Sequence, residues 1–354
     1  MKLEKLRLAM QEKGIDALLV TDEINQRYLL NYAFTDGYLV ILQESAYMVT
    51  DFRYREEAEK YADPAFRVVT PTPRAPYVQA LLKNARVRTV GYEDRRLTVA
   101  EYHRFEELLS GYSLTPVGGL LEELRQYKTE EEVRLMQAAQ DITDQAFSHL
   151  LSVLRPDMTE IEVALELEFE MRRLGADGYA FDTIAVSGDA SSLPHGKPRN
   201  EKLHRGFLTM DFGAKYKGYC SDMTRTVVIG RADSEMKRLY DTVLEAQKQG
   251  IAAVRAGAVC REVDGVARTL IDGAGYEGCF GHSLGHGVGL FIHESPRLAQ
   301  GAGNACLVSG QVVTVEPGIY LAGKYGCRIE DMVLVQEEAC YNFTHSPKDL
   351  IEIL

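Results

Sequence analysis

The sequence predicts an α/β layer domain over residues 1–125, followed by a larger α+β domain over residues 126–354. Two observations lead to this prediction. In the first region, runs rich in β-branched and aromatic residues alternate with helix-like segments. In the second region, two pairs of long helices are each followed by strand-like runs. A chain of 354 residues is long enough for two domains with a core each.

The first region begins with a short amphipathic helix, because the apolar residues between Met1 and Gly14 are interrupted by charges and the segment ends at a glycine. This pattern lacks the apolar core of a signal peptide. Strands are predicted at 16–20, 38–42, 46–50, 66–70 and 87–92, and helices at 51–61, 77–84 and 98–109. The region contains no metal-like cluster and no phosphate-binding loop, so it suggests no chemistry of its own.

The second region begins after a short linker at 116–119. Two capping boxes, in which a threonine precedes a glutamate by three positions, open its first two helices. The boxes are Thr129–Glu132 and Thr159–Glu162, and the helices are predicted to end at Leu154 and Gly175. A strand at 181–188 and helices at 233–255 and 260–274 follow. Two helix pairs, each followed by strands, indicate two similar halves around a curved sheet.

Composition excludes several classes of partner. The net charge is −12 and no cluster of basic residues occurs, so neither nucleic acid nor an anionic membrane is an expected partner. No run approaches the roughly 18 apolar residues of a membrane span. The six cysteines form no CxxC pair. A chain of this size needs no disulfide framework, so we expect a cytoplasmic protein.

Asp211 and Asp222 stand eleven residues apart, each in a run rich in β-branched and aromatic residues. The Lys-Tyr-Lys-Gly stretch between them predicts a hairpin turn in which Gly218 takes a positive φ. A hairpin would bring the two carboxylates from neighbouring strands toward one point. Like charges at one point raise each other's pKa unless a cation neutralises them, and a divalent metal ion would do so.

Three further segments supply candidate ligands, namely His286, Glu316 and Glu330. Each of the five residues has an ordinary structural explanation when taken alone, such as a turn aspartate or a surface glutamate. Together they form a set rich in hard oxygen ligands, which suits two divalent ions that share carboxylates. Two such ions would lower the pKa of a shared water, so that a metal-bridging hydroxide is present at neutral pH.

The strings that carry these ligands resemble the metal-binding segments of the pita-bread metallopeptidases. They read DFGAKYKGYCSDMTRT, GHSLGHGVGLFIHE, TVEPGIY and RIED, and the resemblance is closest to the Xaa-Pro peptidase branch, aminopeptidase P and prolidase. The resemblance implies a creatinase/prolidase-type N-terminal domain and a pita-bread (creatinase/aminopeptidase-like) catalytic domain. It implies a dinuclear metal site that consists of Asp211, Asp222, His286, Glu316 and Glu330. Mn²⁺ is the expected metal, with Co²⁺ or Zn²⁺ as alternatives, and a homodimer is the expected assembly.

The resemblance further implies catalytic roles for residues around the ligands. His293 would face the substrate and stabilise the tetrahedral intermediate, while His195 would line the substrate pocket or, alternatively, cap a turn. Glu316 is the candidate for moving a proton from water to the leaving nitrogen. Arg328 precedes Glu330 by two residues, and in one strand both would face the same side. Arg328 would then either bind substrate or orient a carboxylate ligand.

Three more residues are expected beside the ligands. His282 lies four residues before His286 in a glycine-rich stretch, where one of the two histidines suffices as a ligand. Tyr219 and Thr224 flank Asp222 and are expected to orient it or to line the substrate pocket, and Thr224, with Thr226, could also hydrogen-bond metal carboxylates. All three would support the ligands without binding the metal.

The predicted function is hydrolysis of the Xaa-Pro bond, in Xaa-Pro dipeptides or at the N-terminus of longer proline-containing peptides. Methionine aminopeptidases share the ligand set, but the preceding domain of about 125 residues favours the Xaa-Pro branch. A creatinase-like hydrolase without metal would lack ligands that are all present here. A non-catalytic peptide-binding protein with the same fold is the alternative outside the enzymes, and its metal content would distinguish it.

Overall fold

The computed structural model describes residues 2–354, which form two compact units, unit 1 up to Arg125 and unit 2 from Gln126 onward. The helices of unit 1 are α1 (Lys2–Glu12), α2 (Glu23–Leu30), α3 (Phe52–Tyr61), α4 (Arg74–Asn84), α5 (Val99–Leu108) and α6 (Leu120–Arg125). Its strands are β1 (Ala17–Val20), β2 (Tyr38–Leu42), β3 (Ala46–Val49), β4 (Phe66–Val69), β5 (Thr89–Tyr92) and β6 (Ser113–Pro116).

A mixed sheet forms the centre of unit 1, with the strand order β4-β3-β2-β1-β5-β6. Nearly all residues of β1, β2 and β3 are buried, which requires that both faces of the sheet are covered. On one face, Leu19 and Val40 of the strands pack with Val78 and Leu82 of α4. This arrangement confirms the predicted α/β layer domain.

Unit 1 also contains elements that the sequence analysis did not predict, namely α2, β6 and α6. The buried face of α2 carries the polar residues Asn25 and Gln26, so the apolar periodicity of a helix is hidden there. The buried Glu93 carboxylate supplies Asn25 with a hydrogen-bond partner, because Asn25 Nδ2 donates to Glu93 Oε1 at 2.7 Å. Part of the segment predicted as a linker lies in β6, and α6 follows it.

Unit 2 holds the long helices α7 (Glu130–Val153), α8 (Glu160–Arg173), α9 (Ser234–Ala253) and α10 (Cys260–Ile271), and the short segments η1 (Gly188–Ser192), η2 (Asp272–Tyr276) and η3 (Gln300–Ala302). Both predicted capping boxes are present at the starts of α7 and α8. No helix within residues 2–354 has the length and apolar character needed to cross a membrane.

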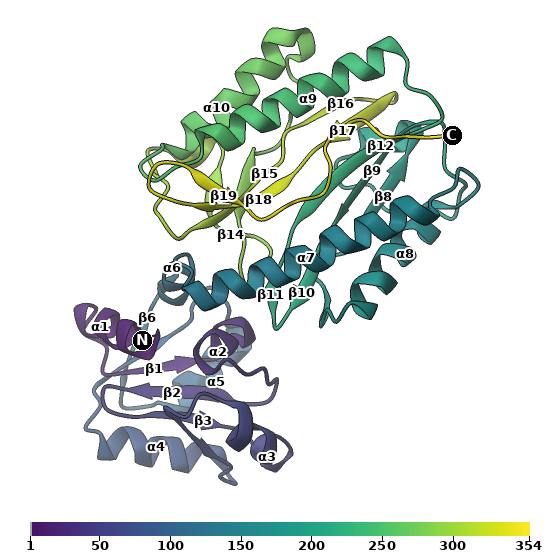
Figure 1. Cartoon of the computed structure of the whole chain (residues 1–354). Helices are drawn as coiled ribbons and strands as arrows, with labels where there is room; N and C mark the ends of the chain where they lie inside the picture. Colours follow the sequence, from purple (N-terminus) through teal and green to yellow (C-terminus); the bar gives the residue numbers. More distant parts are fainter. Residues whose placement is uncertain (1) are drawn as a thin grey trace. The chain divides into compact units, whose positions relative to one another are not determined.

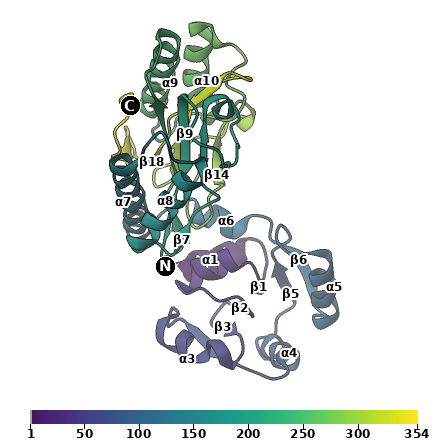
Figure 2. The same ribbon diagram turned by 90° about the vertical axis from the view of Figure 1, so that its right-hand side faces the viewer.

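The strands of unit 2 are β7 (Gly178–Tyr179), β8 (Ile184–Ser187), β9 (Gly206–Phe212), β10 (Ala214–Tyr216), β11 (Tyr219–Cys220), β12 (Met223–Ile229), β13 (Gly285–Gly287), β14 (Glu294–Leu298), β15 (Val312–Val315), β16 (Gly318–Leu321), β17 (Tyr325–Arg328), β18 (Asp331–Val335), β19 (Cys340–Asn342) and β20 (Glu352–Ile353). One half of the unit packs α7 and α8 on the sheet β20-β12-β9-β8. The other half packs α9 and α10, which lie side by side, near the sheet β14-β13-β15-β18-β19 (Figures 1 and 2). The two similar halves expected from the sequence are therefore present.

The paired strands β9 and β12 position the first two candidate ligands. They run antiparallel with Asp211 opposite Thr224, and the hairpin β10–β11 extends the pair beyond them. Lys217 and Gly218 form the tight turn of that hairpin with φ angles of 45° and 85°, as the sequence predicted for the glycine. The hairpin brings Asp222, which directly precedes β12, back beside Asp211.

The expectation that Arg328 and Glu330 share one strand is wrong. β17 ends at Arg328 and pairs with β16, whereas β18 begins at Asp331 and pairs with β15. The chain leaves one sheet and enters another at Ile329 and Glu330, so the alternation of side chains along a single strand does not apply. Both side chains nevertheless line the same cavity.

Candidate metal centre

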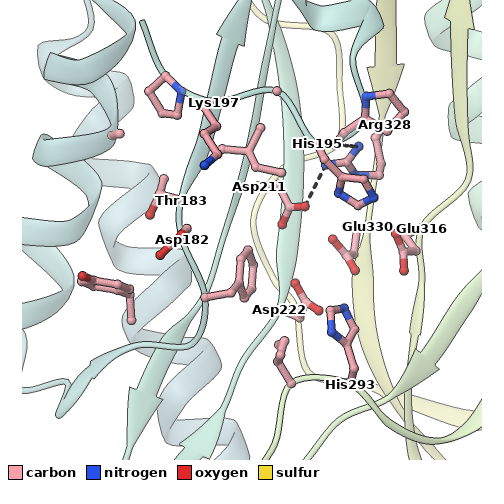
Figure 3. A pocket seen from close by; sticks show the side chains of 18 of the residues that line it. Asp182, Thr183, His195, Lys197, Asp211, Asp222, His293, Glu316, Arg328 and Glu330 are labelled. Carbon is pink, nitrogen blue, oxygen red and sulfur yellow. Dashed lines mark hydrogen bonds and ion pairs between the residues drawn. The ribbon is translucent and has the colours of Figure 1, made fainter.

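The five candidate ligands lie at or near strand ends in unit 2. Asp211 lies near the end of β9, Asp222 precedes β12, His286 lies in β13, Glu316 follows β15 and Glu330 precedes β18. These strand ends converge because β9 pairs with β12, and β15 pairs with both β13 and β18. All five side chains line one cavity, and Figure 3 shows four of their carboxylates around it.

The geometry around His286 favours metal binding. Asp222, His286 and Glu330 each offer one ligand atom, and these atoms lie within 4.8 Å of one another. His286 Nε2 is also 3.5 Å from Glu316 Oε1. Its Nδ1 lies 3.0 Å from the carbonyl oxygen of Gly287, to which only a protonated nitrogen can donate. The lone pair of Nε2 is therefore directed at the carboxylates and available to a metal ion.

The electrostatics of the cluster fit a divalent cation. Burial, and then repulsion between neighbouring acids, raises the pKa values of Asp222 and Glu330 well above normal. Burial also raises the pKa of Glu316 to about 8. Asp211 Oδ1 is buried and has no hydrogen-bond partner among residues 2–354, which is costly for a carboxylate. A dication coordinated by these oxygens would relieve the repulsion between the carboxylates and would supply the partner that Asp211 Oδ1 lacks.

Arg328 is a buried cation beside these carboxylates. Its Nη2 donates to Asp211 Oδ2 at 2.7 Å, and its Nε donates to Thr224 Oγ1 at 3.1 Å. Thr224 in turn donates to Glu330 Oε2 at 2.7 Å. Arg328 and Thr224 thus hold two candidate ligands in fixed orientations. Thr224 was expected to orient Asp222 or to hydrogen-bond metal carboxylates, and its contact with Glu330 agrees with the second expectation.

Tyr320 is a partly buried residue of the site that was not predicted from the sequence. Its hydroxyl accepts from Arg328 Nη1 at 2.7 Å and lies 2.9 Å from His282 Nε2. His282 Nδ1 donates to the Ser283 carbonyl at 2.9 Å, so Nε2 must accept from the tyrosine. Burial lowers the pKa of His282 to about 4, which keeps this histidine neutral. The hydrogen-bond chain connects Arg328 to His282, which lies in the loop directly before the strand of His286.

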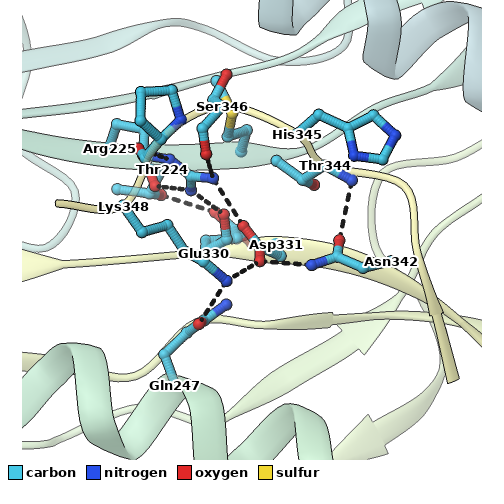
Figure 4. Close-up of polar contacts among 12 residues, drawn as sticks. Thr224, Arg225, Gln247, Glu330, Asp331, Asn342, Thr344, His345, Ser346 and Lys348 are labelled. Carbon is cyan, nitrogen blue, oxygen red and sulfur yellow. Dashed lines mark hydrogen bonds and ion pairs between the residues drawn. The ribbon is translucent and has the colours of Figure 1, made fainter. Parts of the chain in front are cut away.

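A second hydrogen-bond network holds the backbone of Glu330 in place (Figure 4). Arg225 Nη1 donates to the Glu330 carbonyl at 2.7 Å, and Nη2 donates to Asp331 Oδ1 at 2.8 Å. Asp331 Oδ2 accepts from Lys348 Nζ at 2.6 Å and from Asn342 Nδ2 at 2.8 Å. Burial alone would raise the pKa of Asp331, but the charges of Arg225 and Lys348 outweigh burial and lower it.

The structure does not support a role for Tyr219 beside Asp222. The Tyr219 hydroxyl donates to Glu132 Oε1 at 2.7 Å, and Glu132 belongs to the capping box of α7. Tyr219 is not among the residues that line the cavity. Flanking positions in sequence could not reveal this, because β11 turns the tyrosine toward α7.

The cavity beside the ligands has a volume of about 700 Å³. His195 and His293 line it as expected, and the rings of His293 and His286 lie with their centroids 4.5 Å apart. Two exposed cations, Lys197 and Arg297, also line it. Neither cation was predicted from the sequence, because a single Lys or Arg in a loop or strand carries no recognisable signature of a site.

Comparison with known proteins agrees with this description. Residues 134–337 match metallopeptidase family M24, and residues 2–127 match the creatinase/prolidase N-terminal domain. An uncharacterised peptidase from Bacillus subtilis is 41% identical over 353 residues, which is 99% of each chain. Two solved structures cover 99% of this chain and 99% of their own. They are an Xaa-Pro dipeptidase from Bacillus anthracis, with 43% identity and a TM-score of 0.95, and an X-Pro aminopeptidase from Thermotoga maritima, with 34% identity and a TM-score of 0.91.

Proposed function

The chain belongs to metallopeptidase family M24, and on this premise we propose that it hydrolyses Xaa-Pro bonds, in Xaa-Pro dipeptides or at the N-terminus of longer peptides. The observation that carries the proposal is the convergence of four carboxylates and one imidazole lone pair on a single cavity. The Xaa-Pro dipeptidase and the X-Pro aminopeptidase to which the chain is similar over its whole length support proline specificity.

The proposed metal site consists of Asp211, Asp222, His286, Glu316 and Glu330. The chemistry that two divalent ions would supply at these residues is activation of a water molecule as nucleophile at neutral pH and polarisation of the scissile carbonyl. The side chains around the ligands then act on the proton and on the developing charge.

We propose that His293 stabilises the negative charge that develops on the carbonyl oxygen of the substrate. Burial, and then the positive charge of Arg297, lowers the pKa of His293, so its imidazole is neutral at pH 7. A neutral imidazole keeps one N–H, which can donate to the oxyanion of the tetrahedral intermediate. The exposed position of His293 on the cavity wall, next to His286, suits this role.

Glu316 is the proposed proton carrier. The nitrogen of proline has no N–H in a peptide, so it must receive a proton as the bond to it breaks. Glu316 Oε1 lies 3.3 Å from the Thr314 hydroxyl, which orients the carboxylate toward the cavity. A carboxylate held beside the reacting water can take the proton from that water and deliver it to the leaving nitrogen.

A dipeptide substrate carries its own carboxylate close to the scissile bond, and Arg297 is the proposed partner of that carboxylate. Arg297 is exposed on the cavity wall and has no ion-pair partner in the part of the chain that the structure describes. Its charge acts on His286, His293 and Glu316, which places it near the reacting centre. A guanidinium can bind a carboxylate through two parallel hydrogen bonds.

Three finer statements belong to the same proposal. We propose Mn²⁺ as the physiological metal, which the oxygen-rich ligand set favours, although Co²⁺ and Zn²⁺ also suit this set. All six cysteines are unpaired thiols, which supports a reducing compartment such as the cytoplasm. A homodimer is the proposed assembly, from the family resemblance.

Three substrates assayed side by side test the proposal. Metal-stripped protein is reloaded with Mn²⁺ and given an Xaa-Pro dipeptide, an Xaa-Pro-Yaa tripeptide and a Met-Ala-Yaa tripeptide, with Glu330→Ala as the control. We expect cleavage of proline substrates only, and loss of that activity in Glu330→Ala. Cleavage of Met-Ala-Yaa alone would instead assign methionine aminopeptidase activity. Absence of both cleavage and retained metal would favour a non-catalytic peptide-binding protein.

A further inference from the structure

We propose that the outer half of the cavity is a subsite for the residue that follows proline, and that it accepts an apolar residue with a free carboxylate. The outer half is lined by Ile161, Leu165, Tyr179, Phe181, Asp182 and Lys197. The inference rests on the proposed Xaa-Pro activity and specifies its substrate class as Xaa-Pro-Yaa tripeptides with an apolar Yaa. Two features that the catalytic steps do not use carry the inference.

The first feature is an apolar stripe on α8. Ile161, Leu165 and Phe169 follow each other at four-residue intervals, so they lie on one face of the helix. They are 37%, 56% and 70% exposed, which is unusual for large apolar side chains on one helix face. Ile161 and Leu165 line the cavity, and Phe181 and Tyr179 also line it. An apolar wall inside a cavity is suited to an apolar side chain of a ligand.

The shape of the cavity sets the direction in which a peptide binds. Its inner end is closed, since Asp222 and Glu330 are 4% and 1% exposed, whereas the α8 side is open to solvent. A peptidase that removes one N-terminal residue needs a closed space for that residue only. The chain beyond proline must leave through the open side, where it meets the α8 stripe. A cavity of about 700 Å³ lies within the range that holds ligands larger than a dipeptide.

The second feature is the position of Lys197. Its side chain lies on the same side of the cavity as Asp182 and Thr183 in Figure 3, apart from Glu316 and His293. It is exposed and has no hydrogen-bond or ion-pair partner within residues 2–354. An unpaired ammonium at the open end can bind the terminal carboxylate of a peptide that extends past proline.

The remaining charges of the outer half narrow the choice of Yaa. Asp182 of the outer half and Glu168, which also lines the cavity and lies on α8 beside Leu165, have no cation partner among the described residues. Lys197 can offset one carboxylate of the substrate, but an acidic Yaa would bring a second carboxylate toward two uncompensated acids. The outer half therefore selects an apolar Yaa over an acidic one.

The test uses Mn²⁺-loaded full-length protein with four substrates, Ala-Pro, Ala-Pro-Leu, Ala-Pro-Leu-amide and Ala-Pro-Glu. For the wild type we expect kcat/KM for Ala-Pro-Leu to exceed that for its amide and that for Ala-Pro-Glu by about 5- to 10-fold. In Lys197→Met the difference between acid and amide should disappear. In Leu165→Ser the preference for leucine over glutamate should fall about 5-fold.

Phe169→Ser is the matched control, because Phe169 belongs to the same stripe but does not line the cavity. We expect this variant to keep the wild-type selectivity. Binding of Ala-Pro-Leu to metal-stripped protein, measured by calorimetry, gives a readout independent of turnover and should weaken in Lys197→Met. Equal losses on acid and amide in Lys197→Met, or cleavage of Ala-Pro but not of Ala-Pro-Leu, would overturn the inference and leave the proposed function intact. Failure to cleave any of the four would overturn the proposed function itself.

Discussion

Replacing Arg225 by methionine should destabilise unit 2 and weaken metal binding together. The guanidinium is buried, with a side chain 2% exposed, and pairs with Asp331, which is 0% exposed. It also donates to the carbonyl oxygens of Glu330 at 2.7 Å and of Ser346 at 2.9 Å. Arg225→Met leaves these acceptors unpaired in a buried environment, where one lost partner of an ion pair costs about 3–5 kcal/mol. Asp331 keeps Lys348 at 2.6 Å, so the lower end of that range is expected.

The losses of stability and of metal affinity should be visible in two assays. Urea unfolding of metal-stripped protein, followed by circular dichroism, should show a free energy of unfolding about 3 kcal/mol lower than the wild type. Metal affinity should fall about 10- to 100-fold, because the backbone of the ligand Glu330 loses a fixed contact. Lys348→Met is the matched control. It removes the other cationic partner of Asp331 but no contact to Glu330, so it should lower stability less and leave metal affinity close to the wild type.

Two results would refute this reasoning. Unfolding of Arg225→Met at the same urea concentration as the wild type would show that the buried network contributes no stability. An equal loss of metal affinity in Arg225→Met and Lys348→Met would show that the contact to Glu330 does not matter.

Three more predictions concern single residues. His293→Gln should lower kcat about 10²- to 10³-fold while metal content, measured by atomic emission, stays at the wild-type level. Tyr320→Phe leaves His282 and Arg328 each without one partly buried hydrogen-bond partner, so kcat/KM should fall about 10-fold, and an unchanged value would contradict the proposed hydrogen-bond chain. Burial raises the pKa of Glu93 from 4.5 to about 7, so its folded form holds the proton more tightly than its unfolded form. The stability that this gives below pH 4.5 is lost as pH rises toward 7, by about 3 kcal/mol, and urea unfolding of Glu93→Gln should lack this pH dependence.

The two domains and the five candidate ligands could be predicted from the sequence for a local reason. Each ligand stands in a short segment whose residue types and order are informative without knowledge of the fold. The capping boxes of α7 and α8 were predictable for the same reason, since a threonine and a glutamate three positions apart act within one turn.

The features that the sequence did not reveal depend on contacts between distant segments. Tyr320 reaches His282 and Arg328 only because β16 pairs with β17. The break between Arg328 and Glu330 arises because β17 and β18 belong to different sheets. Helix α2 was hidden because its buried face is polar and is satisfied by a carboxylate from far along the chain. The proposed role of Lys197 could not be predicted because it depends on the apolar residues of α8, which line the same cavity but lie far away in the sequence.

The most direct test of the central claim is metal stoichiometry measured together with turnover. Metal-stripped protein is titrated with Mn²⁺, and bound metal per chain and hydrolysis of Ala-Pro are followed in the same samples. We expect two ions per chain, with activity that rises as they are bound and that is absent without metal. Hydrolysis of Ala-Pro at an unchanged rate in metal-stripped protein would contradict the proposed metal-dependent mechanism. The absence of bound metal at a high Mn²⁺ concentration would also contradict it.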